Sequence, residues 1–503
     1  MLGLFIVGVA GFLSGRSTVH SVIATPTVEL KNGDTYDLTA SSVTKEIGGK
    51  PQKMLAYNDS IPGPTIRVPQ GAEVTINFKN NTDQPTLLHS HGVRMDNAFD
   101  GSQLQQKEIP PGGSYRYKLK FPDAGVFWYH PHLHEVSQQP LGLYGNFIVT
   151  PTDGSYWPPV NREVPLMIGD LLVDRDSTIA SFRDPSDHAL MGRFGNMMLV
   201  NGTDTYRLSV KRGEVVRFYM TDVANTRVFN LSIPGVQMKL VGGDNGRYSH
   251  ESFADSVLIS PSERAVVDVL FDKPGTYTIT HNTPDKKYTM GIVTVSNDTA
   301  TQSFKLQFST LRSNTDIEKV IPNLNSYFAK PDDKNLTLTV DLGSMAMGGN
   351  HMMHGGQMMA NDGMHMGGTD DEKIEWEDSM AMMNEMSIVN NVKWKIVDQD
   401  TGAVGDAISW TFKKGDMVKI KMYNDSNSAH PMQHPIHFHG QRFIVLTTNG
   451  VKNTNMVWKD TALVQKGDAV EILVDMSNPG TWMAHCHIAE HLEAGMMFTF
   501  AVQ

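Results

Sequence analysis

Cysteine is almost absent from this chain. Cys486 is the only one among 503 residues, so no disulfide can form within the molecule. Four residues near it in the sequence, however, carry soft or borderline metal ligands: His485, His487, His491 and Met496. A thiolate, a nearby imidazole, a distant second imidazole and a weak axial thioether form the donor set of a blue-copper electron-transfer site. The alternative, a free Cys that serves as a small hydrophobic residue, does not account for these neighbours.

The chain also lacks an excess of basic charge and any long apolar run. Its net charge of −11 gives no basic surface for nucleic acid. The apolar run at residues 2–13 is too short to span a bilayer, so we expect no stable membrane span. Residues 1–24 resemble a secretory signal with Ala24 before the cleavage site. The alternatives are a short uncleaved anchor or a misplaced start, and no twin-Arg pair is present. We expect a periplasmic or secreted protein.

The rest of the chain is rich in turns and in alternating strands, which predicts an all-β protein. Two patterns occur three times. In the first pattern, a Gly near the start is followed by alternating polar and apolar residues, which predicts strands at 70–78, 212–218 and 414–420. In the second pattern, a turn leads into a strand, at 123–129, 273–279 and 478–484. A repeat of this size predicts one β-sandwich per unit. We place the units at 25–155, 156–302 and 303–503.

Histidines fall at equivalent positions of the first and third units. Aligned on Gly125, Gly275 and Gly480, the three units carry His130-Pro-His132, Thr280-His-Asn282 and His485-Cys-His487. A second pair precedes these: His89-Ser-His91 in the first unit and His437-Phe-His439 in the third, where the middle unit has Asn230-Leu-Ser232. Each His-x-His places both imidazoles on one face of a strand, as a metal cluster requires. The middle unit is therefore predicted to be a spacer.

Four motifs in this order resemble those of the three-domain multicopper oxidases, of the bacterial cuprous oxidase or laccase type. They are His-x-His-Gly at 89–92, Trp-Tyr-His-x-His at 128–132, His-Pro-x-His-x-His-Gly at 434–440 and His-Cys-His-x3-His-x4-Met at 485–496. The resemblance implies three cupredoxin-like Greek-key β-sandwiches. It also implies four copper ions, one of type 1, one of type 2 and two of type 3.

The resemblance also implies the ligands. It assigns the type 1 copper to His434, Cys486, His491 and Met496, and the type 2 copper to His89 and His437. It assigns the type 3 pair to His91, His130, His132, His439, His485 and His487. In the family, single electrons pass from a reductant through the Cys to the cluster, where four of them reduce O2 to water.

Protons must reach the cluster as well. Asp100 matches a family acid near the type 2 copper and is expected to relay protons, although turn chemistry before Gly101 explains an Asp equally well. Many bacterial members carry a second acid directly after the residue that matches His491. This chain has Leu492 there, with Glu490 and Glu493 beside it, so the second relay has no clear candidate.

Methionine is concentrated late in the chain. Twelve of the 30 Met, and three His, lie within 343–386. One interpretation is a flexible low-complexity insert, or methionines that fill gaps in a core. The other is a segment that collects Cu(I), because thioethers are soft ligands that prefer this ion. A Met-rich insert resembles those of bacterial cuprous oxidases, in which an acid and a Met before the type 1 His also bind substrate copper. Here Met432 matches that Met, and His430 stands at the position of the acid. Asp460 resembles a family residue near the blue site, or is an ordinary hydrogen-bonded Asp.

We therefore predict an enzyme that oxidises Cu(I) with O2, serves copper tolerance and accepts phenols or aromatic amines more slowly. A laccase with a phenol as natural substrate is the first alternative, and an open groove beside His434 and His491 would favour it. A non-enzymatic copper sink is the second, but storage needs no complete cluster. A two-domain nitrite reductase is disfavoured by the spacer unit.

Overall fold

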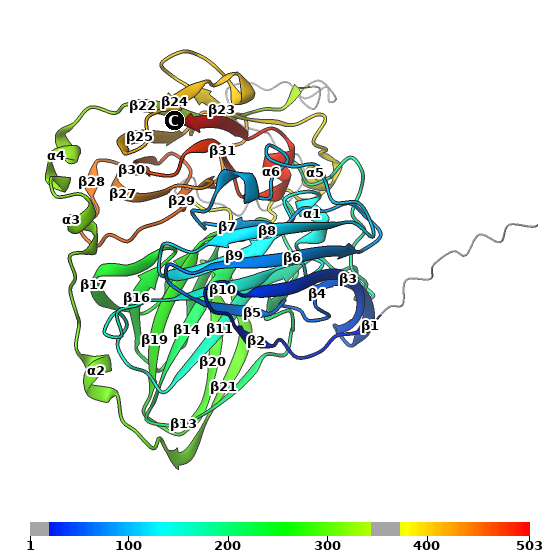
Figure 1. Cartoon of the computed structure of the whole chain (residues 1–503). Coiled ribbons are helices and arrows are strands. Elements are labelled where there is room, and N and C mark those ends of the chain that lie inside the picture. The colour runs from blue at the N-terminus through cyan, green and yellow to red at the C-terminus, as the bar shows by residue number, and fades with distance from the viewer. Residues whose placement is uncertain (1–19, 344–372) are drawn as a thin grey trace, which may run out of the picture.

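The computed structural model describes residues 20–343 and 373–503, which form three β-sandwiches of two sheets each. In Figure 1 the third sandwich, yellow to red, is at the top, the first, blue to cyan, is in the centre, and the second, green, is below. The prediction of an all-β chain with three sandwiches is confirmed. The predicted signal and Met-rich insert fall largely on residues 1–19 and 344–372, outside the described residues.

The first sandwich packs two five-stranded sheets. One sheet has the order β1 (His20–Ser21), β3 (Thr35–Ile47), β6 (Glu73–Asn81), β8 (Ser114–Lys120), with β4 (Lys50–Tyr57) paired to β3. The other has the order β2 (Thr27–Glu29), β5 (Thr65–Pro69), β10 (Gly145–Thr150), β9 (Gly125–His130), β7 (His89–His91). Strand β6 illustrates the cause: Val74, Ile76 and Phe78 face the core, and polar residues alternate with them.

The second sandwich pairs a six-stranded with a five-stranded sheet. The first has the order β12 (Met197–Val200), β11 (Arg162–Leu171), β14 (Glu214–Asp222), β19 (Arg264–Phe271), β16 (Met238–Gly243), β17 (Gly246–Ala254). The second has the order β13 (Arg207–Arg212), β21 (Lys287–Thr299), β20 (Gly275–Asn282), β15 (Phe229–Ser232), β18 (Val257–Ile259).

The third sandwich repeats this plan. Its six-stranded sheet has the order β23 (Lys393–Asp398), β22 (Lys334–Asp341), β25 (Asp416–Asn424), β30 (Ala469–Met476), β27 (Arg442–Thr448), β28 (Val451–Lys452). Its five-stranded sheet has the order β24 (Trp410–Phe412), β32 (Met497–Val502), β31 (Gly480–Cys486), β26 (His434–Phe438), β29 (Thr461–Val464). The boundaries predicted at 155/156 and 302/303 fall between β10 and β11 and between β21 and β22, and remain proposals.

Helices are short and lie in the connections. They are η1 (Asn97–Phe99), α1 (Glu135–Gln138), α2 (Lys305–Ser309), α3 (Asp316–Val320), α4 (Leu324–Ala329), α5 (Ala381–Met386), η3 (Gly405–Ala407) and α6 (Ala489–Glu493). Helix α1 of the first sandwich contacts α6 of the third. No helix in the described part of the chain is long and apolar enough to cross a bilayer.

The strand register corrects one detail of the repeat. His89 lies opposite His130 and His437 lies opposite His485, and the equivalent pair in the second sandwich is Ser232 opposite Thr280. Residues 232–235, Ser-Ile-Pro-Gly, therefore align with His-x-His-Gly, and the alignment on residues 230–232 was wrong by two positions. The error arose because the sequence offered no histidine to fix the register there.

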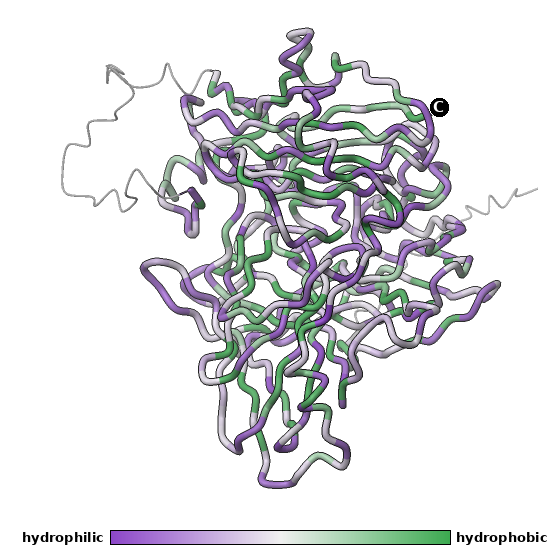
Figure 2. Tube along the Cα trace, turned by 90° about the vertical axis from the view of Figure 1, so that its left-hand side faces the viewer, coloured by the Kyte–Doolittle hydropathy of each residue, from purple (hydrophilic) through white to green (hydrophobic). Residues whose placement is uncertain are grey.

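Each sandwich has its own hydrophobic core, and hydrophobic positions run along the strands in Figure 2 while peripheral loops are mostly hydrophilic. One segment crosses between sandwiches. Ala189, Leu190, Met191 and Phe194, which follow β11 in the chain, pack into the core of the third sandwich. This core also contains Cys486, so the loop from the second unit helps to enclose the predicted copper site.

Candidate metal centres

Two groups of metal-ligand side chains lie in the third sandwich and at its border with the first. The first group, here called the thiolate site, consists of His434, Cys486 and His491. His434 begins β26, Cys486 ends the adjacent β31, and His491 lies on α6. The Cys486 Sγ is 3.6 Å from the Nδ1 of His434 and 3.8 Å from the Nδ1 of His491, and these two nitrogens are 3.4 Å apart. All three side chains are fully buried.

The thiolate site has the size and chemistry of a metal site. The centre of a triangle with these edges is about 2.1 Å from each corner, close to metal–nitrogen distances of ~2.0–2.1 Å. Burial lowers the pKa of His434 to about 3, which keeps its imidazole neutral. Burial also raises the pKa of the Cys486 thiol, so metal binding must displace that proton. The donor set of one thiolate and two imidazoles suits copper.

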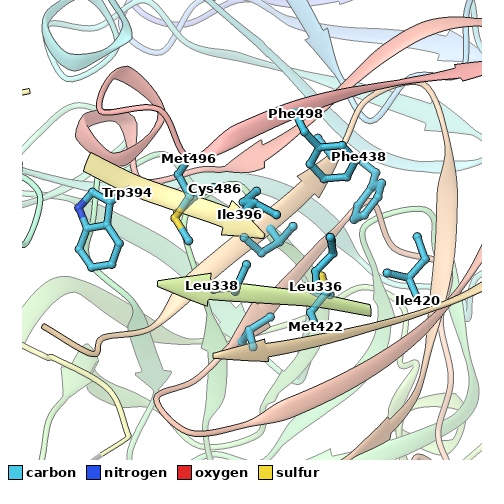
Figure 3. Close-up of a cluster of buried hydrophobic side chains, with 14 of the residues drawn as sticks. Leu336, Leu338, Trp394, Ile396, Ile420, Met422, Phe438, Cys486, Met496 and Phe498 are labelled. Carbon is cyan, nitrogen blue, oxygen red and sulfur yellow. The ribbon is translucent and has the colours of Figure 1, made fainter. Parts of the chain in front are cut away.

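Met496 lies next to Cys486 at the thiolate site. The backbone N–H of Cys486 donates to the Met496 carbonyl at 3.0 Å, and Figure 3 shows the two side chains next to each other at the edge of the apolar core. Met496 is fully buried. The thiolate site is thus enclosed by hydrophobic side chains of the third sandwich and of the second-unit loop that contains Leu190 and Phe194.

The second group, here called the histidine cluster, contains eight buried imidazoles from the first and third sandwiches. They are His89, His91, His130, His132, His437, His439, His485 and His487. All eight lie on or directly after β7, β9, β26 and β31. Neighbouring ring centroids are 3.8 to 6.2 Å apart, as in His91–His437 and His130–His132. The structure therefore brings together every residue that the sequence predicted for the type 2 and type 3 coppers.

Hydrogen bonds fix which nitrogen of each ring faces inward. The Nδ1 atoms of His89, His130 and His437 donate to the carbonyls of Asp100, Pro131 and Asp460 at 2.7 to 2.8 Å. A carbonyl only accepts, so Nδ1 carries the proton and Nε2 has a free lone pair. The Nε2 atoms of these three rings are buried and have no hydrogen-bond partner. A bound cation would satisfy them.

Three rings converge most closely. The Nε2 of His439 is 3.0 Å from that of His485 and 3.3 Å from that of His132. Their Nδ1 atoms are taken by the Asp100 carboxylate, the Cys486 carbonyl and the Glu135 carboxylate. Burial lowers the pKa of His485 to about 3, and nearby imidazoles add to this. Neutral rings whose lone pairs face one another form a cation site.

His91 has the opposite orientation. Its Nε2 is 3.0 Å from the Asp460 carboxylate, and its buried Nδ1 is the atom without a partner. Asp460 does not lie at the thiolate site, where the sequence suggested a match, but behind the histidine cluster. The Asp460 backbone carbonyl accepts from the His437 ring, so this one residue orients a ring of the first sandwich, His91, and a ring of the third, His437.

Arg264 of the second sandwich holds Asp460 in place. Its Nη1 donates to Asp460 Oδ1 at 2.7 Å and its Nε to the Val126 carbonyl of the first sandwich at 2.8 Å. Both charged side chains are fully buried. The sequence analysis missed this contact. The unit without ligands therefore contributes an arginine that joins all three sandwiches behind the cluster.

Glycines follow both His-x-His pairs for steric reasons. Gly92 has φ +78°, and a Cβ there would collide with the Asp460 carboxylate. Gly440 has φ +65°, and a Cβ there would collide with the Trp482 ring. L-residues rarely adopt such angles, so the motif glycines protect the packing directly behind the cluster.

The chain matches known protein families along most of its length. Family models described as multicopper oxidase match residues 37–154, 162–306 and 377–503. The chain belongs to the multicopper oxidases. Enzymes of this family bind copper and couple a reducing substrate to O2, which confirms the predicted enzyme class. The number and types of copper ions remain predictions.

Known multicopper oxidases match along almost the whole chain. Copper resistance protein A of Escherichia coli is 24% identical over 627 aligned residues, covering 98% of this chain and 97% of that protein. A metallo-oxidase from Campylobacter jejuni has a TM-score of 0.71 and 22% identity, covering 96% of both chains. A laccase-like CueO from Ochrobactrum sp. has a TM-score of 0.72 and 22% identity, covering 96% and 100%. The two structures share the three-sandwich, cupredoxin-like fold.

Two buried acids besides Asp460 contact the histidine cluster of this multicopper oxidase, and they are Asp100 and Glu135. Asp100 lies between His89 and His439, and burial raises its pKa to about 7. Burial also raises the pKa of Glu490 on α6 to about 7, but this carboxyl accepts from the Asn225 amide at 3.2 Å instead of from a ring of the cluster. Glu135 on α1, which the sequence analysis did not single out, is 3.1 Å from the Nδ1 of His132. Helix α1 therefore supplies a carboxylate to the cluster, on the same helix that contacts α6.

The outer side of the thiolate site is covered. The Trp394 ring stacks on His491 with centroids 4.1 Å apart, and lies 4.8 Å from His434 and 6.5 Å from His430. Met432 is fully buried in the core, while His430 is only partly covered. The Nε2 of His430 is buried and has no partner.

The described end of the Met-rich insert lies next to this region. Gln433 immediately precedes His434. Its side-chain amide accepts a hydrogen bond from the backbone N–H of Glu375 and donates one to the Glu375 carbonyl. Met380 and Met383 pack against the core that contains the thiolate site. Met382 and Met386 of α5 are 72% and 70% exposed, so this end of the insert presents thioethers to solvent.

Proposed function

We propose that this multicopper oxidase oxidises Cu(I) and reduces O2 to water. The thiolate site, together with Met496, would hold the type 1 copper. His89 and His437 would hold the type 2 copper. The type 3 pair would be held by two sets of three rings, which are His91, His130 and His487, and His132, His439 and His485.

The observation that carries the Cu(I) proposal is the burial of the thiolate site. The His434 and His491 side chains are fully buried. A phenol needs a groove beside such an imidazole in order to bind close enough for electron transfer. A metal ion needs only ligands near the site, and His430, Met380 and Met383 supply soft or borderline donors there.

Copper supplies the one-electron cycling and the four-electron reduction of O2. The protein contributes the connection and the proton path. Cys486 is bonded in sequence to both His485 and His487, and Ile436 and His437 of β26 pair with Cys486 and His485. This continuous backbone joins the two centres. Asp100 remains the proposed proton relay, because it contacts rings of both sandwiches and matches the family acid.

The names of relatives support the same assignment. One is called a copper resistance protein and another a metallo-oxidase, which fits a role in copper tolerance. Such a role places the enzyme where Cu(I) meets O2 outside the cytoplasm. We therefore propose a periplasmic or secreted location, together with the export signal predicted at 1–24.

The deciding experiment removes the insert but keeps its anchored end. Residues 344–372 are replaced by a Gly/Ser segment of equal length that lacks Met and His, with 373–386 unchanged. Steady-state O2 uptake is then measured with Cu(I) or with a phenol. We expect Cu(I) turnover to fall and phenol turnover to stay or rise. Unchanged Cu(I) turnover, with the phenol as the better substrate of both proteins, would support a laccase instead.

A further inference from the structure

Trp394 occupies an unusual position for a core tryptophan. It lies on β23, is 1% exposed, and its indole N–H donates to the Ala189 carbonyl at 2.8 Å. The interplanar angle to His491 is 26°, a stacked arrangement, whereas His434 meets the ring edge-on. The hydrogen bond and the stacking together hold the ring in one orientation.

This orientation fills the place that an aromatic reductant would need. Aromatic rings associate by offset stacking or edge contact, with centroids ~4.5–7 Å apart. The indole takes both positions at once, stacking on His491 and meeting His434 edge-on. A phenol could approach these imidazoles only after displacing the indole from a packed core, which is strongly unfavourable.

We propose that Trp394 is a specificity-determining residue that excludes aromatic reductants from the thiolate site and leaves the Cu(I) route open. This inference rests on the function proposed above and deepens it. A Cu(I) ion held near His430 would lie beside the indole, whose ring centroid is 6.5 Å from that of His430, 4.8 Å from that of His434 and 4.1 Å from that of His491. The Cu(I) would lose one electron and become Cu(II), and this electron would pass through the contacts of the ring to the Cu(II) that the thiolate site would hold, which would become Cu(I).

The core offers a matched control. Trp410 lies in the same hydrophobic core, is 4% exposed, and donates its indole N–H to Asp398 at 3.1 Å. Its ring contacts Phe412 and Phe498 but no histidine. Trp410→Leu should therefore remove similar packing without uncovering His491.

The test compares Trp394→Leu with Trp410→Leu in copper-loaded protein. For Trp394→Leu we expect kcat/KM for a phenol such as 2,6-dimethoxyphenol to rise by about tenfold or more, and that for Cu(I) to stay or fall. For Trp410→Leu both should remain close to the parent values. Retention of the blue absorption band in both variants shows that the thiolate site is intact.

A second readout needs no copper. Free indole should raise the melting temperature of metal-free Trp394→Ala, since it refills the space that the substitution opens, and it should inhibit phenol oxidation by the loaded variant. If indole binds but phenol turnover is not raised, the inference is wrong. Its failure differs from failure of the proposed function, in which the parent enzyme itself would not oxidise Cu(I).

Discussion

The thiolate site and the histidine cluster take adjacent residues of β31, Cys486 and His485, yet the protein holds the two sites in opposite ways. The thiolate site lies within the hydrophobic core of one sandwich, among side chains such as Ile436 and Phe498. The histidine cluster lies between two sandwiches and is surrounded by buried acidic side chains, including Asp100, Glu135 and Asp460. One centre is therefore positioned by packing and the other by hydrogen bonds and ion pairs. Substitutions should therefore affect one centre and leave the other intact.

The largest expected effect is the loss of the sulfur. Cys486→Ser removes the thiolate from the thiolate site but leaves every ring of the histidine cluster and its partners in place. We expect loss of the blue absorption band and a fall in O2 uptake of more than ~100-fold. Copper analysis should still find the ions of the cluster. Loss of all copper would show that the two centres do not form independently.

Breaking the charge network should harm the cluster and spare the thiolate site. Arg264→Met leaves Asp460 as an uncompensated buried charge, so we expect the free energy of unfolding to fall by ~3–5 kcal/mol. The orientation of His91 should be lost with it, which copper content and the type 3 absorption band would report.

Arg217→Met is the matched control for this variant. Arg217 forms a buried ion pair with Asp268 at 2.8 Å entirely within the second sandwich. It should lower the melting temperature by a similar amount but leave the copper spectra unchanged. An equal loss of the type 3 absorption band in both variants would contradict a specific role for Arg264.

An intermediate effect is expected at Glu135. Glu135→Ala removes the carboxylate that lies 3.1 Å from the His132 Nδ1, so the copper affinity of the cluster should fall by ~10–100-fold. Glu135→Gln keeps a carbonyl acceptor and should stay within a few fold. Competition with a chelator measures both affinities. Equal losses in the two variants would indicate that charge, rather than ring orientation, is what Glu135 contributes.

The smallest effect is expected at Met496. Met496→Leu conserves volume, so the fold should lose less than ~1.5 kcal/mol. Removal of a weak axial donor should raise the reduction potential of the blue site, measured by spectroelectrochemistry, with activity retained. Met422→Leu, in the same core but away from Cys486 in Figure 3, is the control. An unchanged potential would show that Met496 is not a ligand.

The sequence predicted the local features of this molecule well. Alternating residues such as Val74, Ile76 and Phe78 indicated strands, and the resemblance of the motifs to those of multicopper oxidases indicated His434, Cys486 and His491, which the structure brings together. These features depend on period-two patterns and on short ranges of chain. The sequence could equally predict the spacer role of the middle unit, because Thr280 and Asn282 stand where the other units have histidines.

Contacts between distant residues could not be predicted in this way. Arg264 and Asp460 are 196 positions apart, and a lone Arg after a turn carries no signal of its partner. Trp394 resembles any apolar strand residue until the fold places its ring on His491. Glu135 was overlooked because its helix has only four residues and follows a motif that already had its ligands. A search for acids near each motif would have found it.

The most direct test of the account is the stoichiometry of the reaction. Cu(I) is added in limiting amounts to the copper-loaded enzyme, and O2 uptake and peroxide are followed together. The account predicts four Cu(I) oxidised for each O2 consumed, with no peroxide released. No O2 uptake above the uncatalysed rate, or peroxide as the product, would contradict a Cu(I)-oxidising enzyme with a working cluster.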